Sequence, residues 1–244
     1  MPAPVMPREL TATLSETATV EVRGAGALAR AFVFEVEPDN DPTITFNEEP
    51  QRQASGALKL TYSTNDDFGI ASAYVAVEPT EGSYVITSTE ANARPLVSAP
   101  DFPLTLPKGK QRIGAAQTIR DLSSHPWAGA LVSLTPIARD EAGQVGRGVP
   151  IEITLPQRTF QKPLARALVE QRRVLALDAN RAGRVLDAMD GLMIAPELFF
   201  DDASIYLGMT HARARLVAAQ TDDELREVLD VLWQLALHIE DGDL

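Results

Sequence analysis

Residues 221–241, TDDELREVLDVLWQLALHIED, decide the fold of the C-terminal part of the chain. Thr221, followed three positions later by Glu224, predicts a capping box at the start of a helix. Apolar residues then return every third or fourth position, which is the spacing of one helix face. They are Leu225, Val228, Leu229, Leu232, Leu235 and Ile239. A stripe of this width needs an apolar partner, so the pattern predicts a helix packed against other helices.

Three further segments between residues 159 and 220 repeat the helical spacing. Pro163 suits the first turn of the first segment, and Pro196 is expected to end the second. The predicted apolar faces are Leu164, Leu168, Gln171 and Leu175; Val185, Leu186, Met189, Leu192 and Met193; and Ile205, Met209, Ala212 and Leu216. Because the connections are short, neighbouring helices should be antiparallel, and residues 159–244 are predicted to form a small helical bundle.

Residues 42–156 alternate between apolar and polar side chains, as strands do. About seven short strands are predicted, with turns at residues 65–69 and 140–144 and a strand at 84–87. Four prolines make residues 95–107 an edge or a loop. No helical period interrupts the series, so this region is predicted to be an antiparallel immunoglobulin-like β-sandwich.

The N-terminal residues 1–37 contain three short alternating runs, at 10–14, 20–22 and 32–36. They predict a partial β region, interpreted as the end of a preceding sandwich domain. The acidic, proline-bounded segment 37–42 predicts a hinge. The chain is therefore expected to be an α+β multidomain protein divided into residues 1–37, 42–156 and 159–244.

Charge and composition exclude several classes of function. The net charge is −12, with 9 basic and 15 acidic residues from position 159 onward and 13 and 19 before it. Acid spread this evenly disfavours binding to nucleic acid or to an anionic membrane surface. The chain has no cysteine, which excludes disulfides, zinc–thiolate sites and a cysteine nucleophile.

The sequence contains no convincing catalytic motif. Its three histidines, at positions 125, 211 and 238, are too scattered for a zinc-binding pair. The glycines at 24 and 26 predict a hairpin turn, because no helix follows to bind a dinucleotide. We therefore predict no catalytic residues and no cofactor.

Acidic loop residues are the remaining candidates for a site. Calcium binds six to eight oxygen ligands, often carboxylates and carbonyls of loops. The calcium candidates are Asp39, Asp41, Asp66, Asp67 and Asp140. Asp is also an ordinary turn residue, since its side chain accepts hydrogen bonds from the local backbone, so turn formation is the competing interpretation.

Two groups of segments resemble known proteins. Residues 66–70 and 138–144 resemble turns of bacterial immunoglobulin-like domains. The second, more specific group consists of residues 125–129, 162–173, 206–208 and 232–244. The combination looks like an uncharacterised family of large alphaproteobacterial envelope proteins. In that family two membrane helices precede a periplasmic portion of sandwich domains and helices, and a charged low-complexity tail follows. The resemblance implies a periplasmic segment, anchored to the inner membrane through other parts of the parent chain, and it implies no activity.

These observations favour a non-enzymatic role. The leading hypothesis is an interaction or scaffold segment with a protein partner in the cell envelope, in which the bundle provides the docking surface. One alternative is a calcium- or glycan-binding module that uses the sandwich loops. A second alternative is a hydrolase of envelope polymers, which would need two carboxylates facing each other across a groove.

Overall fold

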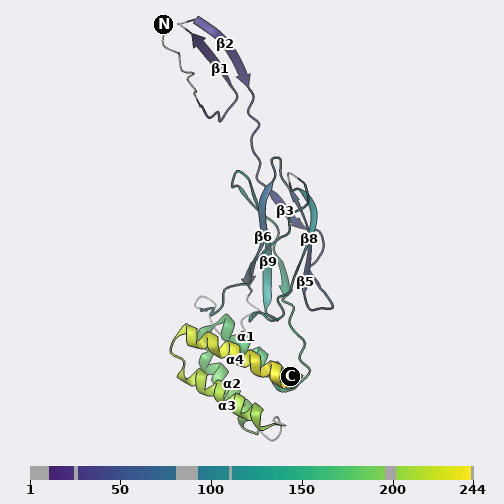
Figure 1. Ribbon diagram of the computed structural model, residues 1–244, viewed down its shortest axis with the longest axis vertical. Helices are drawn as coiled ribbons and strands as arrows, with labels where there is room; N and C mark the ends of the chain where they lie inside the picture. Colours follow the sequence, from purple (N-terminus) through teal and green to yellow (C-terminus); the bar gives the residue numbers. More distant parts are fainter. Residues whose placement is uncertain (1–10, 25–26, 81–92, 110–111, 196–201, 243–244) are drawn as a thin grey trace, which may run out of the picture. The chain divides into compact units, whose positions relative to one another are not determined.

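The computed structural model describes residues 11–24, 27–80, 93–109, 112–195 and 202–242 (Figure 1). The chain divides into two compact units, Met1–Asn40 and Asp41–Leu244. The described residues form an α+β fold with antiparallel sheets and four α-helices. Strands β1 and β2 belong to the first unit, and all other elements belong to the second.

The first unit contains a two-stranded antiparallel hairpin. Strand β1 (Ala18–Gly24) pairs with β2 (Ala27–Phe34), with a register shift between Val22 and Arg23. The prediction of a strand at 10–14 is wrong for residues 11–14, which belong to no strand. Val33 is 76% exposed, and Val22, Phe32 and Phe34 are also exposed, because two strands alone bury little apolar surface.

The strands of the second unit form two antiparallel sheets (Figure 1). In one, β5 pairs with β3 and β4 along one edge and with β8 along the other. In the second, β9 pairs with β6 along one edge and with β10 and β11 along the other. The short strand β7 pairs with the free edge of β6. The bounds are β3 Thr43–Phe46, β4 Gln51–Arg52, β5 Leu58–Asn65, β6 Ile70–Pro79, β7 Phe102–Pro103, β8 Gly114–Arg120, β9 Leu131–Asp140, β10 Val145–Arg147 and β11 Ile151–Thr154.

The predicted turn at 65–69 does not form a hairpin, because β5 and β6 lie in different sheets. Asp66 makes the corner: its Oδ2 accepts hydrogen bonds from the backbone N–H groups of Phe68, at 3.0 Å, and of Gly69. Gly69 has a φ of 117°, which only glycine adopts without strain. The strands β4 and β10 were not predicted, and the strand predicted at 84–87 lies outside the described residues.

Two glycines allow the edges of the two sheets to approach. A Cβ added at Gly146 would lie 1.6 Å from the carbonyl oxygen of Pro42, and one at Gly148 would lie 2.4 Å from that of Ile44. Gly148 also donates its N–H to the carbonyl of Pro136, at 2.8 Å. Pro136 is therefore tolerated inside β9, because its nitrogen, which has no hydrogen, faces the break between β10 and β11.

The helical spacing correctly predicted four α-helices. They are α1 (Pro163–Leu177), α2 (Ala182–Met193), α3 (Ala203–Ala218) and α4 (Asp222–Asp241), with a short 3-10 helix, η3 (Ala179–Arg181), between the first two. The capping box of Thr221 and Glu224 is present, and every predicted apolar residue of α4 is buried. In α1, however, Arg172 is buried where Gln171 was predicted on the apolar face.

One hydrophobic cluster runs through both sheets and all four helices. Inward-facing residues of β5 and β6, such as Leu60 and Val75, belong to the same cluster as Leu168 of α1 and Leu232 of α4. Helix α1 contacts α2 and α4, and α3 contacts α2 and α4. None of the helices in the described ranges has the length and hydropathy needed to cross a bilayer.

Candidate functional site

The most elaborate polar structure in the second unit lies where the sheets meet the helices. Residues 94–97, which we call the strap, follow the β6 region in sequence but bind the helices through the backbone. The N–H of Leu96 donates to the carbonyl of Ala176 at 3.0 Å, and the N–H of Ala179 donates to the carbonyl of Arg94 at 2.8 Å. The strap therefore pairs with the end of α1.

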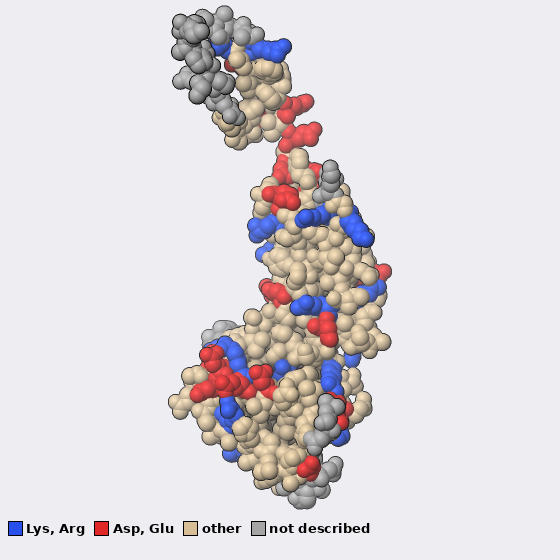
Figure 2. All heavy atoms as spheres, viewed as in Figure 1, with Lys and Arg blue, Asp and Glu red and all other residues tan. Residues whose placement is uncertain are grey.

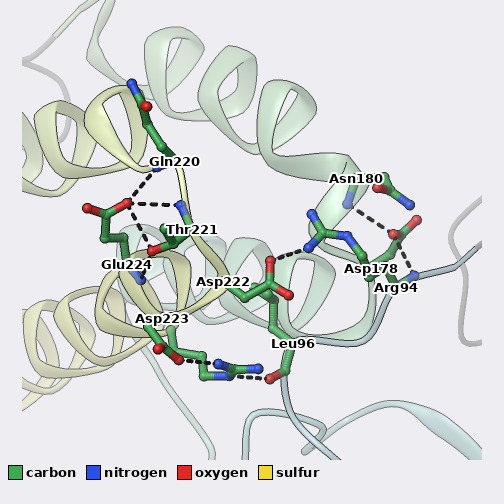
Figure 3. Close-up of polar contacts among 10 residues, drawn as sticks. Arg94, Leu96, Asp178, Asn180, Gln220, Thr221, Asp222, Asp223 and Glu224 are labelled. Carbon is green, nitrogen blue, oxygen red and sulfur yellow. Dashed lines mark hydrogen bonds and ion pairs between the residues drawn. The ribbon is translucent and has the colours of Figure 1, made fainter.

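Side chains fix the strap from two further directions (Figure 3). The buried carboxylate of Asp178 accepts the N–H of Arg94 at 3.1 Å and caps η3 through the N–H of Asn180 at 3.0 Å. From α4, Arg226 donates to the carbonyl of Leu96 at 2.6 Å, and Asp222 forms an ion pair with Arg94. The helices and the strap are thus held together by at least four polar contacts.

A buried arginine forms the centre of this junction. Arg172 donates to the carbonyl of Leu229 at 3.2 Å and to that of Ser124 at 3.1 Å, and its guanidinium lies 4.6 Å from the centre of the Trp233 ring. Burial lowers the pKa of Arg172 to about 10, an effect that the nearby charge of Asp230 partly offsets. Arg172 therefore remains charged and joins α1, α4 and the loop after β8.

His125 lies in the same loop, and it is neutral. Burial, helped by the positive charge of Arg172, lowers the pKa of His125 to about 4. Its Nδ1 accepts the N–H of Trp127 at 3.1 Å, and the indole N–H of Trp127 donates to the carbonyl of Val97 at 3.1 Å. His125 is therefore part of the junction, and its protonation would oppose that packing.

The connection between β11 and α1 binds the end of α4. The carboxylate of Glu240 accepts the N–H groups of Gln161, at 2.7 Å, and Lys162, at 3.0 Å, and these two bonds lower the pKa of Glu240. Arg158 pairs with Asp241 at 2.5 Å and lies 5.4 Å from the centre of the Phe160 ring. The end of α4 is therefore bound to the connection through backbone N–H groups and through a side-chain ion pair.

A pocket of about 320 Å³ lies beside this connection. We call it the arginine pocket, and its lining includes Arg52 of β4, Thr159 and Phe160 of the connection, and Arg166 and Glu170 of α1. A second hollow, of about 430 Å³, lies between α3 and α4 and is lined by alanines together with Arg215, Glu224 and Glu227. In that hollow Arg215 pairs with Glu227, and Glu224 belongs to the capping box.

The acidic candidates are partly brought together. Ile70, which follows the Asp66 turn, lies opposite Asp140 in the ladder of β6 and β9, so Asp66 and Asp140 share one end of the sheets. Asp41 lies just before β3, which begins at that same end, while Asp39 belongs to the first unit. Over the described part of the chain, no three His, Asp or Glu side chains gather closely enough to hold a metal ion.

Asp66 and Asp140 both form turns with one carboxylate oxygen. Oδ1 of Asp140 accepts the N–H groups of Gly143, at 2.6 Å, and of Gln144, at 2.7 Å, as Asp66 does for its own turn. The other oxygens, Oδ1 of Asp66 and Oδ2 of Asp140, are buried and have no hydrogen-bond partner among the described atoms. Both side chains are more than nine-tenths buried.

Sequence reasoning missed the polar residues of the junction and of the arginine pocket. The only signal was the run Gln171-Arg172-Arg173, which interrupts an apolar stripe and puts a cation on the inner face of α1. In the view of Figure 2, acidic side chains gather where α4 begins, with basic ones beside them, whereas over the sheets acidic and basic side chains are scattered.

The fold and the junction define the second unit as an α+β protein whose antiparallel sheets and four helices share one hydrophobic core. Sequence comparison then supplies the family. The model of a domain of unknown function, DUF4175, matches residues 3–244, so the chain belongs to this family. No match was found among curated proteins.

Proposed function

We propose that the chain is a non-enzymatic scaffold segment that docks a protein partner in the cell envelope. The observation that carries the proposal is the junction, where Arg172, Asp178 and the strap fasten the helices to the sheets. The groups whose pKa values shift furthest, His125 and Arg172, stabilise this contact, and neither is in the lining of the two hollows described above. Because the junction holds the helices against the sheets, the outer faces of the helices keep a fixed orientation relative to the sheets.

The proposal includes a finer description of the fold. We infer that the two sheets form an immunoglobulin-like sandwich and that the helices form a bundle. Support comes from the shared cluster of inward-facing residues, from the change of sheet between β5 and β6, and from the contacts that each helix makes with two others. A sandwich spacer that carries a bundle suits a segment that holds a partner at a distance.

The proposal also includes location in the periplasm, with anchoring to the inner membrane through other parts of the parent protein. Its support is the resemblance of four segments, residues 125–129, 162–173, 206–208 and 232–244, to alphaproteobacterial envelope proteins. The test is protease accessibility of the full-length parent in its own host. Cleavage of this segment is expected only after the outer membrane is opened, and protection that persists in spheroplasts would contradict the proposed location.

Docking is tested by site-specific photo-crosslinking in the full-length parent. Leu207 and Val217 are exposed apolar residues of α3, at 67% and 57%, and Val149 is 75% exposed beside the sheets. A crosslinker at 207 or 217 is expected to capture one defined envelope protein, whereas a crosslinker at 149 is not. Equal capture from all three positions, capture from none, or turnover of an envelope polymer by the purified chain would overturn the proposal.

A second candidate function, calcium binding, is favoured by one specific observation. Oδ1 of Asp66 and Oδ2 of Asp140 are buried oxygens without partners at the same end of the sheets. Calcium bound there would need its further oxygens from backbone carbonyls or water, since no third described acidic side chain lies close enough. A buried water molecule would satisfy the same two oxygens.

Thermal unfolding distinguishes the two occupants. Calcium at a hundred times its dissociation constant stabilises a native protein by about 2.7 kcal/mol, and chelation removes the effect. The variants Asp66→Asn and Asp140→Asn should abolish this calcium-dependent rise, whereas Asp101→Asn, in the loop before β7, should keep it. An unchanged melting temperature in calcium, chelator and magnesium would leave water as the occupant and end the calcium proposal.

A further inference from the structure

We propose that the arginine pocket binds an oxyanion, a carboxylate or phosphate group, between the sheets and the helices. This inference does not depend on the scaffold proposal. The pocket lies where β4, the connection after β11 and α1 meet, and its volume of about 320 Å³ exceeds that of a single phosphate group. An occupant would therefore contact both structural layers of the second unit.

Two of the arginines in the pocket have no carboxylate partner within the described ranges. Arg52 donates only to neutral acceptors, the carbonyl of Gln157 at 3.0 Å and the hydroxyl of Thr159 at 3.2 Å. Arg166 is exposed, and its side chain has no ion pair or hydrogen bond with any described residue. The guanidinium group presents several N–H donors in a planar fork that matches carboxylate and phosphate oxygens.

The remaining charges of the pocket are already paired. Glu170 forms an ion pair with Arg173, and Arg158 forms one with Asp241. The pocket therefore keeps two uncompensated positive charges in a chain whose net charge is −12. Repulsion between these two guanidinium groups is relieved when an anion lies between them.

The uncharged groups of the pocket also favour an anion. Thr159 accepts from Arg52, so its hydroxyl hydrogen is available to a ligand. Gln157 accepts from Arg173 through Oε1, at 3.4 Å, which leaves its amide N–H groups as donors. The buried side chains of Phe160 and Val169 form an apolar wall. Donors beside an apolar wall suit a carboxylate or phosphate carried by a larger molecule.

The test is isothermal titration of the whole chain with inorganic phosphate and, separately, with succinate, at constant ionic strength. Saturable binding of at least one anion at a single site is expected. Arg52→Gln and Arg166→Gln should each weaken it roughly tenfold or more, because each removes a charged hydrogen-bond donor. Arg147→Gln, an exposed arginine on β10, should leave it unchanged and serves as the matched control.

Three results decide the outcome. Saturation by phosphate, by succinate or by both identifies the group that the pocket accepts. Loss of binding in the folded glutamine variants, with partial recovery in Arg166→Lys, supports the pocket, and far-UV circular dichroism establishes that each variant is folded. Absence of saturable binding by either anion, or equal weakening in Arg147→Gln, would overturn the proposal.

Discussion

At the scale of single residues, the second unit depends on a few buried polar groups. Among the described residues Arg172 forms no ion pair with a carboxylate, and it instead uses two carbonyl oxygens and the face of Trp233. A buried charge of this kind is tolerated because hydrogen bonds and the negative face of the ring replace its hydration. The apolar residues around it supply the larger part of the stability.

Replacement of Leu232 by alanine tests the helical core. Leu232 is fully buried in the face of α4 that the sequence predicted. Leu232→Ala should lower the free energy of unfolding by about 2–5 kcal/mol, measured by urea denaturation. Leu207→Ala, on the exposed side of α3, should change it by less than about 0.5 kcal/mol. A nearly neutral Leu232→Ala would show that α4 does not pack as described.

The lowered pKa of His125 predicts a dependence of stability on pH. Its pKa is about 4 in the folded protein and about 6.5 when unfolded, so the unfolded state binds more protons between these values. Stability should therefore fall as the pH decreases from 6.5 to 4, by an amount on the order of 1–2 kcal/mol because His125 is partly exposed.

The variant His125→Asn isolates this contribution from that of the carboxylates. The asparagine Oδ1 can accept the N–H of Trp127 in place of Nδ1, and it does not titrate. Urea denaturation of both proteins at several pH values should give a smaller acid-induced loss for the variant. Identical losses in the two proteins would show that His125 is not the titrating group.

At the scale of secondary-structure elements, the strap is the feature that sequence reasoning could not find. Residues 95–107 were predicted to be an edge or a loop, and β7 does pair along the edge of β6. The partners of the strap, however, lie far away in sequence: Arg226 and Leu96 are 130 positions apart. Periodicity reports local structure, so it carries no information about such contacts.

Removal of the Asp178 carboxylate should release the strap. In Asp178→Ala the N–H groups of Arg94 and Asn180 lose the Asp178 carboxylate as acceptor, at a cost of about 0.5–1.5 kcal/mol for each part-buried hydrogen bond. Hydrogen exchange at the amides of Arg94 and Leu96 should become faster.

Asp202→Ala is the control for the strap. Asp202 accepts the N–H of Ser204 at the exposed start of α3, so its loss should cost about 1 kcal/mol without faster exchange at Leu96. If both variants accelerate exchange at Leu96 equally, global destabilisation and not release of the strap explains the result.

The helices were more predictable than the sheets. The spacing of α4 gave its buried face correctly, since a helix face follows from local periodicity. In α1 the spacing predicted Gln171 on the inner face, whereas Arg172 is buried there and packs against Trp233. Alternation predicted most strands but not their partners, so it gave no indication that β5 and β6 lie in different sheets.

In the candidate sites, too, local features could be predicted from the sequence, whereas contacts between distant segments could not. Turn chemistry at Asp66 and Asp140 could be read from the neighbouring glycines, Gly69 and Gly143. The arginine pocket could not, because Arg52, Thr159 and Arg166 come from three separate segments whose approach is a property of the folded chain. Isolated arginines in an acidic sequence give no signal by themselves.

At the scale of the whole molecule, the domain boundaries can be tested. Residues 41–244 form one compact unit with one hydrophobic cluster, while the division near Pro156 stays a prediction. We expect residues 41–244 to unfold in one cooperative calorimetric transition when residues 1–40 are removed. Fragments 41–156 and 157–244 should each be less stable, because each exposes part of the shared cluster.

Two separate unfolding transitions would instead support the predicted domain boundary near Pro156. Two independent transitions in residues 41–244, each matching the transition of one fragment, would show that sheets and helices are separate domains that only touch. The control is the full chain, whose main transition should be unchanged by the removal of the β1–β2 hairpin.

The position of the aromatic residues at the junction has a practical consequence. The chain contains two tryptophans, and both Trp127 and Trp233 lie between the sheets and the helices. Tryptophan fluorescence is therefore an optical reporter of this contact, and no tryptophan lies in the first unit. An early change in emission on heating, ahead of the loss of helical signal, would reveal separation of the two layers before either melts.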